Sequence, residues 1–373
     1  MGELDGVLVV AIEHAVAAPY ASGKLADAGA RVIKVERPEG DFARKYDALV
    51  EGESAYFVWL NRGKESVCLD LKKPEDRDIV LSMVKQADVL IQNLGPGVMD
   101  RLGLGAAGLT SQNPALIICN ISGYGNEGPR AKQKAYDLLI QAESGLCAIN
   151  GTPEGAARVG VSVCDIAAGM TAYQAILEAY IGRLKTGKGR VIDVSLYHAM
   201  ADWMNVPYLQ HRYGGFTPQR NGLQHPSIAP YGAFDCADGK VLLISIQNER
   251  EWKNLCEVAF ESPEAVAKEG FSSNSERVAN RPEVDGWCAA QFKKRSRAEN
   301  IALLEKAQIA FGRLSDLDDL AAHPQNRFIT LDTPAGGIEL LAPGSAVRGE
   351  AKSYGKVPAL DADGQNIRKE FSV

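Results

Sequence analysis

The sequence is poor in the patterns that mark metal sites and disulfide frameworks. Its 373 residues include five histidines, all isolated, and seven scattered cysteines that form no Cys-x-x-Cys pair. An odd number of scattered cysteines argues against a disulfide framework, and the lack of ligand clusters argues against zinc. We therefore expect reduced thiols, a cytoplasmic location and no metal.

Two further classes of protein are disfavoured by what is missing. No apolar run approaches the roughly 18 residues that span a bilayer, and the first residues show no basic segment followed by an apolar one. The net charge of −6 lacks the basic excess typical of nucleic-acid binding. A hydrophobic fraction of 46% and a charged fraction of 24% are ordinary for a globular chain. We expect neither membrane nor nucleic acid as a partner.

The first third of the chain alternates between short apolar runs and helical patterns. This alternation predicts a parallel β-sheet with right-handed crossovers, in which ligands bind at the carboxyl ends of the strands. The expected strands are residues 7–12, 30–36, 66–71, 89–93 and 115–122, with helices at 19–28 and 74–86.

Several polar residues follow these expected strands. Arg37 comes directly after one and is well placed for a nucleotide, although it could equally be a solvated surface charge. Asn93 ends another strand before Gly95 and Gly97, where backbone can approach a ligand closely, but the same pattern suits a simple turn. Lys134 precedes a helix and could meet phosphate or only solvent.

Two glycine-containing segments resemble functional motifs, but the sequence around each of them argues against that function. Residues 103–108 match Gly-x-Gly-x-x-Gly by letter but do not follow a strand, so we reject a dinucleotide fingerprint. The segment Gly160-x-Ser162 lacks the second glycine of a nucleophile elbow, which removes the serine-hydrolase interpretation.

The segment Val159–Met170 predicts a β-branched strand that stops at Asp165, where a helix begins. Apolar residues then recur with helical spacing as far as Leu184, and Gly187 ends the helix. Asp165 is therefore expected at the N-cap, where the backbone N–H groups favour an ionised carboxylate. It could be no more than a cap, or it could be a carboxylate nucleophile.

The second half of the chain changes character. Residues 212–233 are rich in Gly, Pro, Gln and Asn, which indicates a domain boundary and a long functional loop. Before it we expect a strand at 190–195 and a helix at 196–208; after it, a strand at 240–247 and mainly helices to 325. The end of the chain should form short strands and turns that return to the first domain. The expected domains are 1–205, 206–325 and 326–373.

Six stretches together resemble the family III CoA-transferases, the CaiB/BaiF group that contains formyl-CoA transferase and carnitine CoA-transferase. Their order and spacing make the resemblance specific, and it is densest over residues 5–200. The stretches are residues 29–38, 61–72, 87–93, 134–137, 165–170 and 186–189.

The resemblance implies an α/β fold with a Rossmann-like, parallel-sheet large domain, a smaller α+β domain and an interlocked homodimer. It implies no permanently bound cofactor; CoA thioesters are substrates, with an acyl-CoA donor and a carboxylic acid acceptor. The implied catalytic residues are Asp165, Tyr136 and Asp137. The positions implied to contact CoA are Arg37, Leu71, Lys72, Asn93, Arg101 and Lys134.

The family's chemistry requires a carboxylate. Asp165 would attack a thioester, form a mixed anhydride, and then carry CoA as an aspartyl thioester. The 2-methylacyl-CoA racemases of the same fold are the alternative, but Tyr136 stands where they use a histidine, and a phenol is a poor base near neutrality. A non-catalytic CoA-binding module is a third hypothesis, which an intact Asp165 disfavours.

The resemblance also implies substrate contacts at Val16 and His225, although His225 could be a loop histidine bonded to backbone. Its neighbourhood, residues 221–231, has a single glycine where formyl-CoA transferase has a glycine-rich lid. The His225-Pro226 loop resembles that of diacid-specific members, so succinate or mesaconate are the expected kinds of substrate.

Overall fold

The computed structural model describes residues 2–372, which form two compact units. Unit 1 is built from the segment up to Cys147, from Arg158–Arg212 and from Arg327 onward, and unit 2 comprises Ala148–Ala157 and Tyr213–Asn326. The domain bounds expected from the sequence remain a prediction.

Unit 1 is organised around a six-stranded sheet in the order β3-β2-β1-β4-β5-β8, and every neighbouring pair is parallel. The strands are β1 (Leu8–Ile12), β2 (Arg31–Glu36), β3 (Lys64–Cys68), β4 (Val89–Gln92), β5 (Ile117–Ser122) and β8 (Val191–Ser195). The predicted α/β fold with a parallel sheet is confirmed. The central strands are almost continuously apolar because helices cover both of their faces.

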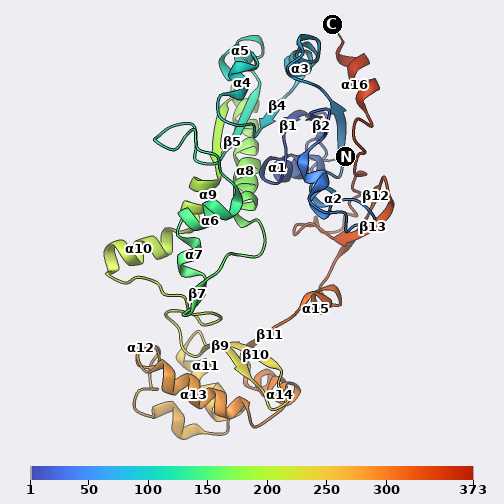
Figure 1. The fold of residues 1–373 in the computed structure, drawn as a ribbon. Coiled ribbons are helices and arrows are strands. Elements are labelled where there is room, and N and C mark those ends of the chain that lie inside the picture. The colour runs from blue at the N-terminus through green and yellow to red at the C-terminus, as the bar shows by residue number, and fades with distance from the viewer. Residues whose placement is uncertain (1, 373) are drawn as a thin grey trace. The chain divides into compact units, whose positions relative to one another are not determined.

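Two helical layers enclose this sheet (Figure 1). One layer packs α1 (Ala17–Asp27) and α8 (Val163–Thr186) against strand residues such as Val9 and Ile91. The other packs α3 (Pro74–Gln86), α5 (Ala106–Gln112) and α16 (Gly364–Phe371) against residues such as Val10 and Leu90. Alternating strand residues therefore contribute to two separate cores.

The end of the chain returns to the edge strand of the sheet. After the hairpin β12 (Phe328–Thr333) and β13 (Gly336–Leu341), Asp363 Oδ2 accepts the N–H of Ser66 at 2.9 Å, and Asp361 Oδ1 accepts that of Cys68 at 2.7 Å. These carboxylates give hydrogen-bond partners to backbone N–H groups of the edge strand β3 that no neighbouring strand can bind. The expectation of only strands and turns here was wrong, because α16 buries Ile367 and Phe371 on one face.

The remaining elements of unit 1 are short connections, apart from the helices that follow β5 and β8. They are η1 (Phe42–Lys45), α2 (Ala55–Leu60), α4 (Val98–Arg101), α6 (Asp137–Glu143) and α9 (Leu196–Trp203); α7 (Leu146–Ile149) and α10 (Asn205–Gly214) begin in unit 1 and end in unit 2.

Unit 2 has its own antiparallel sheet, β11-β10-β9, packed on helices around Trp252, Phe271 and Phe292. Its strands are β6 (Gly151–Thr152), β7 (Gly155–Ala156), β9 (Tyr231–Asp235), β10 (Val241–Ser245) and β11 (Ala310–Arg313). Its helical elements are α11 (Glu249–Asn254), η2 (Leu255–Ala259), η3 (Pro263–Ala267), α12 (Asn274–Ala279), α13 (Arg281–Phe292), α14 (Arg297–Ala307) and α15 (Leu317–Ala321).

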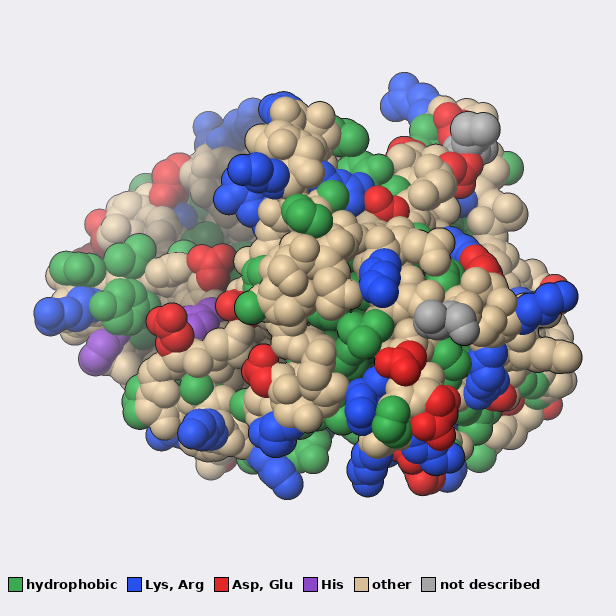
Figure 2. Space-filling model, turned by 90° about the horizontal axis from the view of Figure 1, so that it is seen from above, with side chains coloured by type: hydrophobic (Ala, Val, Ile, Leu, Met, Phe, Trp, Pro, Cys, Tyr) green, Lys and Arg blue, Asp and Glu red, His purple; other side chains and the backbone are tan. Residues whose placement is uncertain are grey.

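The surface carries mixed charge. On the face shown in Figure 2, Lys and Arg side chains are interspersed with Asp and Glu side chains. Within residues 2–372, the helices are all too short or too polar to span a bilayer. In the same range, no group of three or more His, Cys, Asp or Glu side chains is placed to hold a metal ion.

Candidate active site

Asp165 lies in the first turn of α8, at its third residue. The N-cap residue is Ser162, whose side chain makes no capping bond, and residues 159–162 form no strand. The predicted strand and the predicted N-cap position of Asp165 were therefore both wrong. Alternating β-branched residues favour a strand, but here no neighbouring strand pairs with them.

The cap of α8 is supplied by another helix. Asp137, the first residue of α6, accepts the backbone N–H of Cys164 at 2.8 Å and that of Asp165 at 3.3 Å through Oδ1. Its Oδ2 accepts the amide of Gln141 at 2.7 Å. The Asp137 carboxylate therefore already occupies two of the first N–H groups of α8, which are not free to stabilise a developing oxyanion.

The electrostatics of Asp165 also differ from the expectation. Burial, and then the negative charge of Asp137, raise the pKa of Asp165 to about 7. Desolvation disfavours the charged form of a carboxyl group, and a like charge nearby adds to that effect. The helix start was expected to keep this carboxylate firmly ionised. Instead it titrates near neutrality, which makes it a stronger base than an ordinary aspartate.

Two tyrosines belong to this environment. Tyr136 is the N-cap residue of α6 and its side chain is 66% exposed, so it is open to a ligand. Tyr46 follows η1, and its pKa is raised to about 12 by burial and by the charges of Asp41 and Asp165. Sequence reasoning missed Tyr46; the only signal was the aromatic spacing of Phe42, Tyr46 and Tyr56, whose rings are in contact.

Val16 lies near this site because α1 and α8 pack unusually closely. A Cβ on Gly169 would lie 2.7 Å from the carbonyl oxygen of Ala17, so only glycine permits this approach. Val16, the N-cap residue of α1, precedes Ala17, and Asp165 lies one turn before Gly169. The first turns of the two helices are therefore neighbours. Val16 itself is buried.

Four of the expected CoA contacts lie along one edge of the sheet. Glu36 pairs in register with Cys68, and Ile12 pairs with both Val35 and Gln92, so the carboxyl ends of β3, β2, β1 and β4 are aligned. Residues within four positions after these ends are brought to a common edge. They are Arg37 after β2, Leu71 and Lys72 after β3, and Asn93 after β4.

The side chains along this edge differ in their exposure and in how far internal hydrogen bonds leave them free to bind a ligand. Arg37 is exposed, and its Nε donates to the carbonyl of Gly40 at 3.0 Å while its guanidinium lies 5.7 Å from the Phe42 ring centroid. Asn93 instead uses both amide atoms on the backbone of His14. Lys72 is exposed and Leu71 is half-buried.

Arg101 lines a cavity of about 800 Å³ beside the strands β4, β5 and β8. Gln92, Asn120 and Asp193 form its polar floor, with Gln92 Nε2 donating to Asn120 Oδ1 at 2.9 Å and Asn120 Nδ2 donating to Asp193 Oδ1 at 2.9 Å. Lys132 lines the cavity, whereas the expected Lys134 is exposed two residues further on. Both cations lie on the segment that leads to Tyr136.

His225 lies in unit 2, in a tightly bonded loop. Its ring stacks on Tyr231 with centroids 5.2 Å apart, and its Nδ1 accepts the N–H of Ser227 at 3.2 Å. Arg281 Nη2 donates to the carbonyls of His225 and Ile228, each at 2.7 Å. The loop is thus held by side chains, in keeping with its low glycine content.

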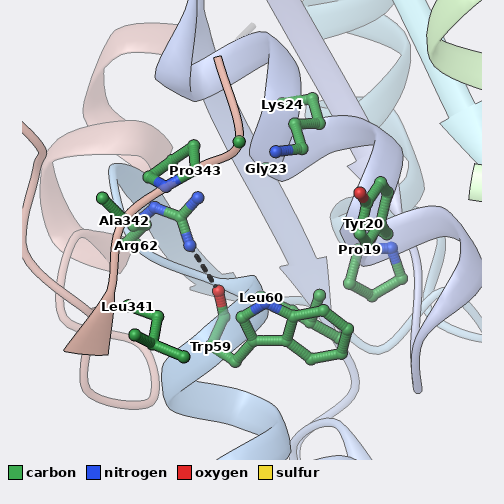
Figure 3. Close-up of a pocket in the computed structure, with 11 residues that line it drawn as sticks. Pro19, Tyr20, Gly23, Lys24, Trp59, Leu60, Arg62, Leu341, Ala342 and Pro343 are labelled. Atoms are coloured by element: carbon green, nitrogen blue, oxygen red, sulfur yellow. Dashed lines mark hydrogen bonds between the residues drawn. The ribbon is translucent and has the colours of Figure 1, made fainter. Parts of the chain in front are cut away.

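A smaller pocket of about 240 Å³ lies between α1, the end of α2 and the segment after β13 (Figure 3). Arg62 lines it, but this guanidinium donates to the carbonyl of Trp59 at 2.6 Å and to the carboxylate of Asp27. Lys24, Tyr20 and Trp59 complete the walls. None of the residues expected to bind CoA or substrate line this pocket.

Comparison with known proteins decides between the interpretations of this site. The family model for CoA-transferase family III matches residues 4–363. The chain belongs to this family. It is 36% identical to the acetyl-CoA:oxalate CoA-transferase of Acetobacter aceti, over 100% of this chain and 96% of the relative. It is 32% identical to the succinyl-CoA:mesaconate CoA-transferase of Haloarcula hispanica, over 100% and 97% of the two chains.

The fold agrees with this assignment. The crystal structure of a CaiB/BaiF family protein from Brucella suis superimposes with a TM-score of 0.86 at 33% identity, covering 100% of both chains. The prediction of a family III CoA-transferase is confirmed, and the enzyme transfers CoA between carboxylic acids. The racemase alternative and the non-catalytic module are not supported, since these relatives are named as transferases.

Proposed function

We propose that Asp165 is the nucleophile that carries CoA from donor to acceptor. The observation that supports this role is its half-buried carboxylate with a pKa of about 7, at the start of a helix whose first N–H groups are already occupied. A carboxylate of raised pKa is a better nucleophile than an ordinary aspartate, and with a pKa of about 7 roughly half of it is ionised at neutral pH.

The chemical steps balance without ATP. An Asp165 oxygen attacks the acyl carbon of the donor thioester, the C–S bond breaks, and CoA leaves as the thiolate with a mixed anhydride behind it. The thiolate then attacks the aspartyl carbon, and the first carboxylic acid leaves as its carboxylate. The acceptor carboxylate repeats the sequence in reverse on the aspartyl-CoA thioester, which restores Asp165. The energy of the thioester is retained at each step.

The surrounding residues have separate roles in this proposal. CoA lies across the aligned strand ends, with Arg37 near its adenine side and Leu71, Lys72, Asn93, Arg101 and Lys134 along its length. Tyr136 lines the acyl site with Asp137 holding α8. Val16 and His225 contact the acyl group or the acceptor. The acids are C4–C5 diacids such as succinate or mesaconate, in line with the relative from Haloarcula hispanica.

We also propose that two copies of the chain interlock as an obligate homodimer in the cytoplasm. The free state of all seven cysteines suits a reducing compartment. The long chain segments that join unit 1 to unit 2 are the parts that would interlock. Sedimentation at micromolar concentration should show a dimer, and a stable, active monomer would contradict this assembly.

The proposed function is tested by combining a substrate screen with covalent trapping. Acyl-CoA donors are paired with carboxylic acid acceptors and the products are read by mass spectrometry. Hydroxylamine added during turnover should leave a hydroxamate on Asp165. Asp165→Ala should abolish transfer while binding of the CoA ester persists, and Asp165→Asn should fail as well because an amide is a poor nucleophile. Full transfer activity in Asp165→Ala would overturn the mechanism.

A further inference from the structure

Gln141 joins the helix that holds Asp137 to the segment that precedes α8. It lies one turn after Asp137 on α6 and its side chain is fully buried. Its Nε2 donates to Asp137 Oδ2 at 2.7 Å, and its Oε1 accepts the N–H of Val159 at 2.8 Å. A buried amide is costly unless it is bonded at both ends, and this one is.

The bond from Gln141 fixes the orientation of the Asp137 carboxylate. One oxygen of Asp137 faces the N–H groups of Cys164 and Asp165, and the other faces Gln141. If the amide were absent, the second oxygen would lose its donor in a half-buried place. The carboxylate would then gain by turning away from α8 toward water.

Gln141 also fixes the chain that leads into α8. Residues 157–162 have no regular secondary structure. Val159 is nevertheless held, because Gln141 contacts both its N–H at 2.8 Å and its carbonyl at 3.4 Å. Two residues of α6 therefore hold this part of the chain: Asp137 binds the first turn of α8 through its carboxylate, and Gln141 binds the segment before it through its amide.

We propose that Gln141 is a positioning residue for the transfer reaction: it locks Asp137 against the first turn of α8 and so sets the place and the charge environment of Asp165. This inference rests on the proposed role of Asp165 as the nucleophile. Gln141 does not touch the reacting atoms; it acts through Asp137.

The groups around Asp165 make the consequence for pH specific. Asp137 faces it from α6, Tyr136 precedes α6, Tyr46 follows η1, and Cys164 neighbours it on α8. Burial raises the pKa of Tyr46 and of Cys164 to about 12, so both are neutral near pH 7. The charge that raises the pKa of Asp165 is that of Asp137. If Asp137 turns away, the carboxyl of Asp165 ionises at lower pH.

The test compares Gln141→Met with the exposed control Gln86→Met on α3. In Gln141→Met, kcat should fall by about 10- to 100-fold because the nucleophile is displaced, while KM for the acyl-CoA donor stays unchanged. The acidic limb of its kcat/KM profile should move to lower pH. Gln86→Met should match the wild type in all three respects. A loss of activity that is equal at every pH, with no shift of the limb, would show a merely structural role and overturn the inference.

A second variant keeps the test decisive if Gln141→Met does not fold. Gln141→Glu has the same length, and in its protonated form it can still donate to Asp137. Its activity relative to the wild type should therefore rise as the pH falls from 8 to 5. A constant ratio over this range would contradict the inference.

Covalent trapping separates this inference from the function on which it rests. If wild-type protein forms no hydroxamate on Asp165, the proposed function fails. If the wild type forms it, and Gln141→Met or Gln141→Glu forms it at the same rate and with the same pH dependence, only the role of Gln141 fails.

Discussion

Asn93 and His14 are joined by two hydrogen bonds. Asn93 Oδ1 accepts the N–H of His14 at 3.0 Å, and Asn93 Nδ2 donates to the carbonyl of His14 at 2.8 Å. The side chain after β4 thus takes the place of another strand and continues the pairing of β1 beyond its last residue. Any contact between Asn93 and CoA must use the remaining lone pairs or the second N–H of this amide.

Replacement of Asn93 should therefore affect the fold as well as the ligand. Asn93→Ala leaves the N–H and the carbonyl of His14 without these partners, which should cost about 1–3 kcal/mol of unfolding free energy. Asn93→Asp keeps the acceptor for the His14 N–H but places a second acceptor oxygen against the His14 carbonyl, so it should also be destabilised. Urea unfolding of both variants measures the difference. Equal stability of Asn93→Ala and the wild type would show that water replaces the side chain.

The raised pKa of Asp165 predicts how stability depends on pH. The pKa of Asp165 is about 7 in the folded protein, against the ordinary value of 3.8 for an aspartate. Between about pH 4 and 7 the folded state holds a proton that the unfolded chain has released, so this group's contribution is complete at low pH and is lost as pH rises to 7. Asp165→Asn cannot ionise. The unfolding free energy of Asp165→Asn minus that of the wild type should therefore increase from about pH 4 to about pH 7 and stay constant at higher pH.

Urea unfolding at a series of pH values tests this linkage, with the exposed Asp78→Asn as the control for a general change of charge. A constant difference between Asp165→Asn and the wild type from pH 4 to 8 would mean that burial and Asp137 do not shift this carboxyl group.

A buried ion network supports the turn that carries Val16. Lys64 Nζ lies 2.7 Å from Glu13 Oε1, and Lys34 Nζ lies 2.9 Å from Asp41 Oδ2; the side chains of all four are inaccessible to solvent. Asp41 Oδ1 accepts the N–H of Ala15 at 3.1 Å. Ala15 has a φ of 63°, a conformation that alanine rarely adopts. The network holds it just before α1 begins.

Breaking this network should be costly. Lys64→Met leaves Glu13 with less compensation for its buried charge, so we expect a loss of about 3–5 kcal/mol in unfolding free energy. The added change Glu13→Gln removes that charge and should recover part of the loss. The exposed Lys85→Met should change stability by less than about 0.5 kcal/mol. A Lys64→Met variant as stable as this control would show that water or Lys34 replaces the missing ammonium.

Apolar runs and helical spacing in the sequence predicted several strands and helices of unit 1 correctly. The apolar runs at β1, β2 and β4 and the helical spacing of α8 identified the parallel sheet and one of its main covering helices. The same rules failed at residues 159–163, because a strand needs a neighbour and this segment is held by Gln141 instead. They also missed α16, because this short helix buries only two large apolar side chains, Ile367 and Phe371.

In the candidate site, too, some features could be predicted from the sequence and others arise only in the fold. A carboxylate at a helix start was visible at Asp165, but its raised pKa was not, because its burial and the approach of Asp137 from a different helix both arise only in the fold. Lys34 and Glu36 are charged residues on the strand β2. Their partners Glu13, Asp41 and Arg44 come from turns on either side, so only the fold reveals that these charges are buried.

The last prediction concerns recognition of CoA at the exposed end of β2. The Nη1 and Nη2 groups of Arg37 are available for phosphate or adenine, because its internal hydrogen bond uses Nε. A charge-assisted contact should contribute about 1–2 kcal/mol, so Arg37→Ala should weaken binding of a CoA ester about 5- to 30-fold. Titration calorimetry measures this, and the difference should shrink at high salt if the contact is exposed. The matched control is the exposed Arg250→Ala in unit 2. If both variants bind as the wild type does, Arg37 is a solvated surface charge.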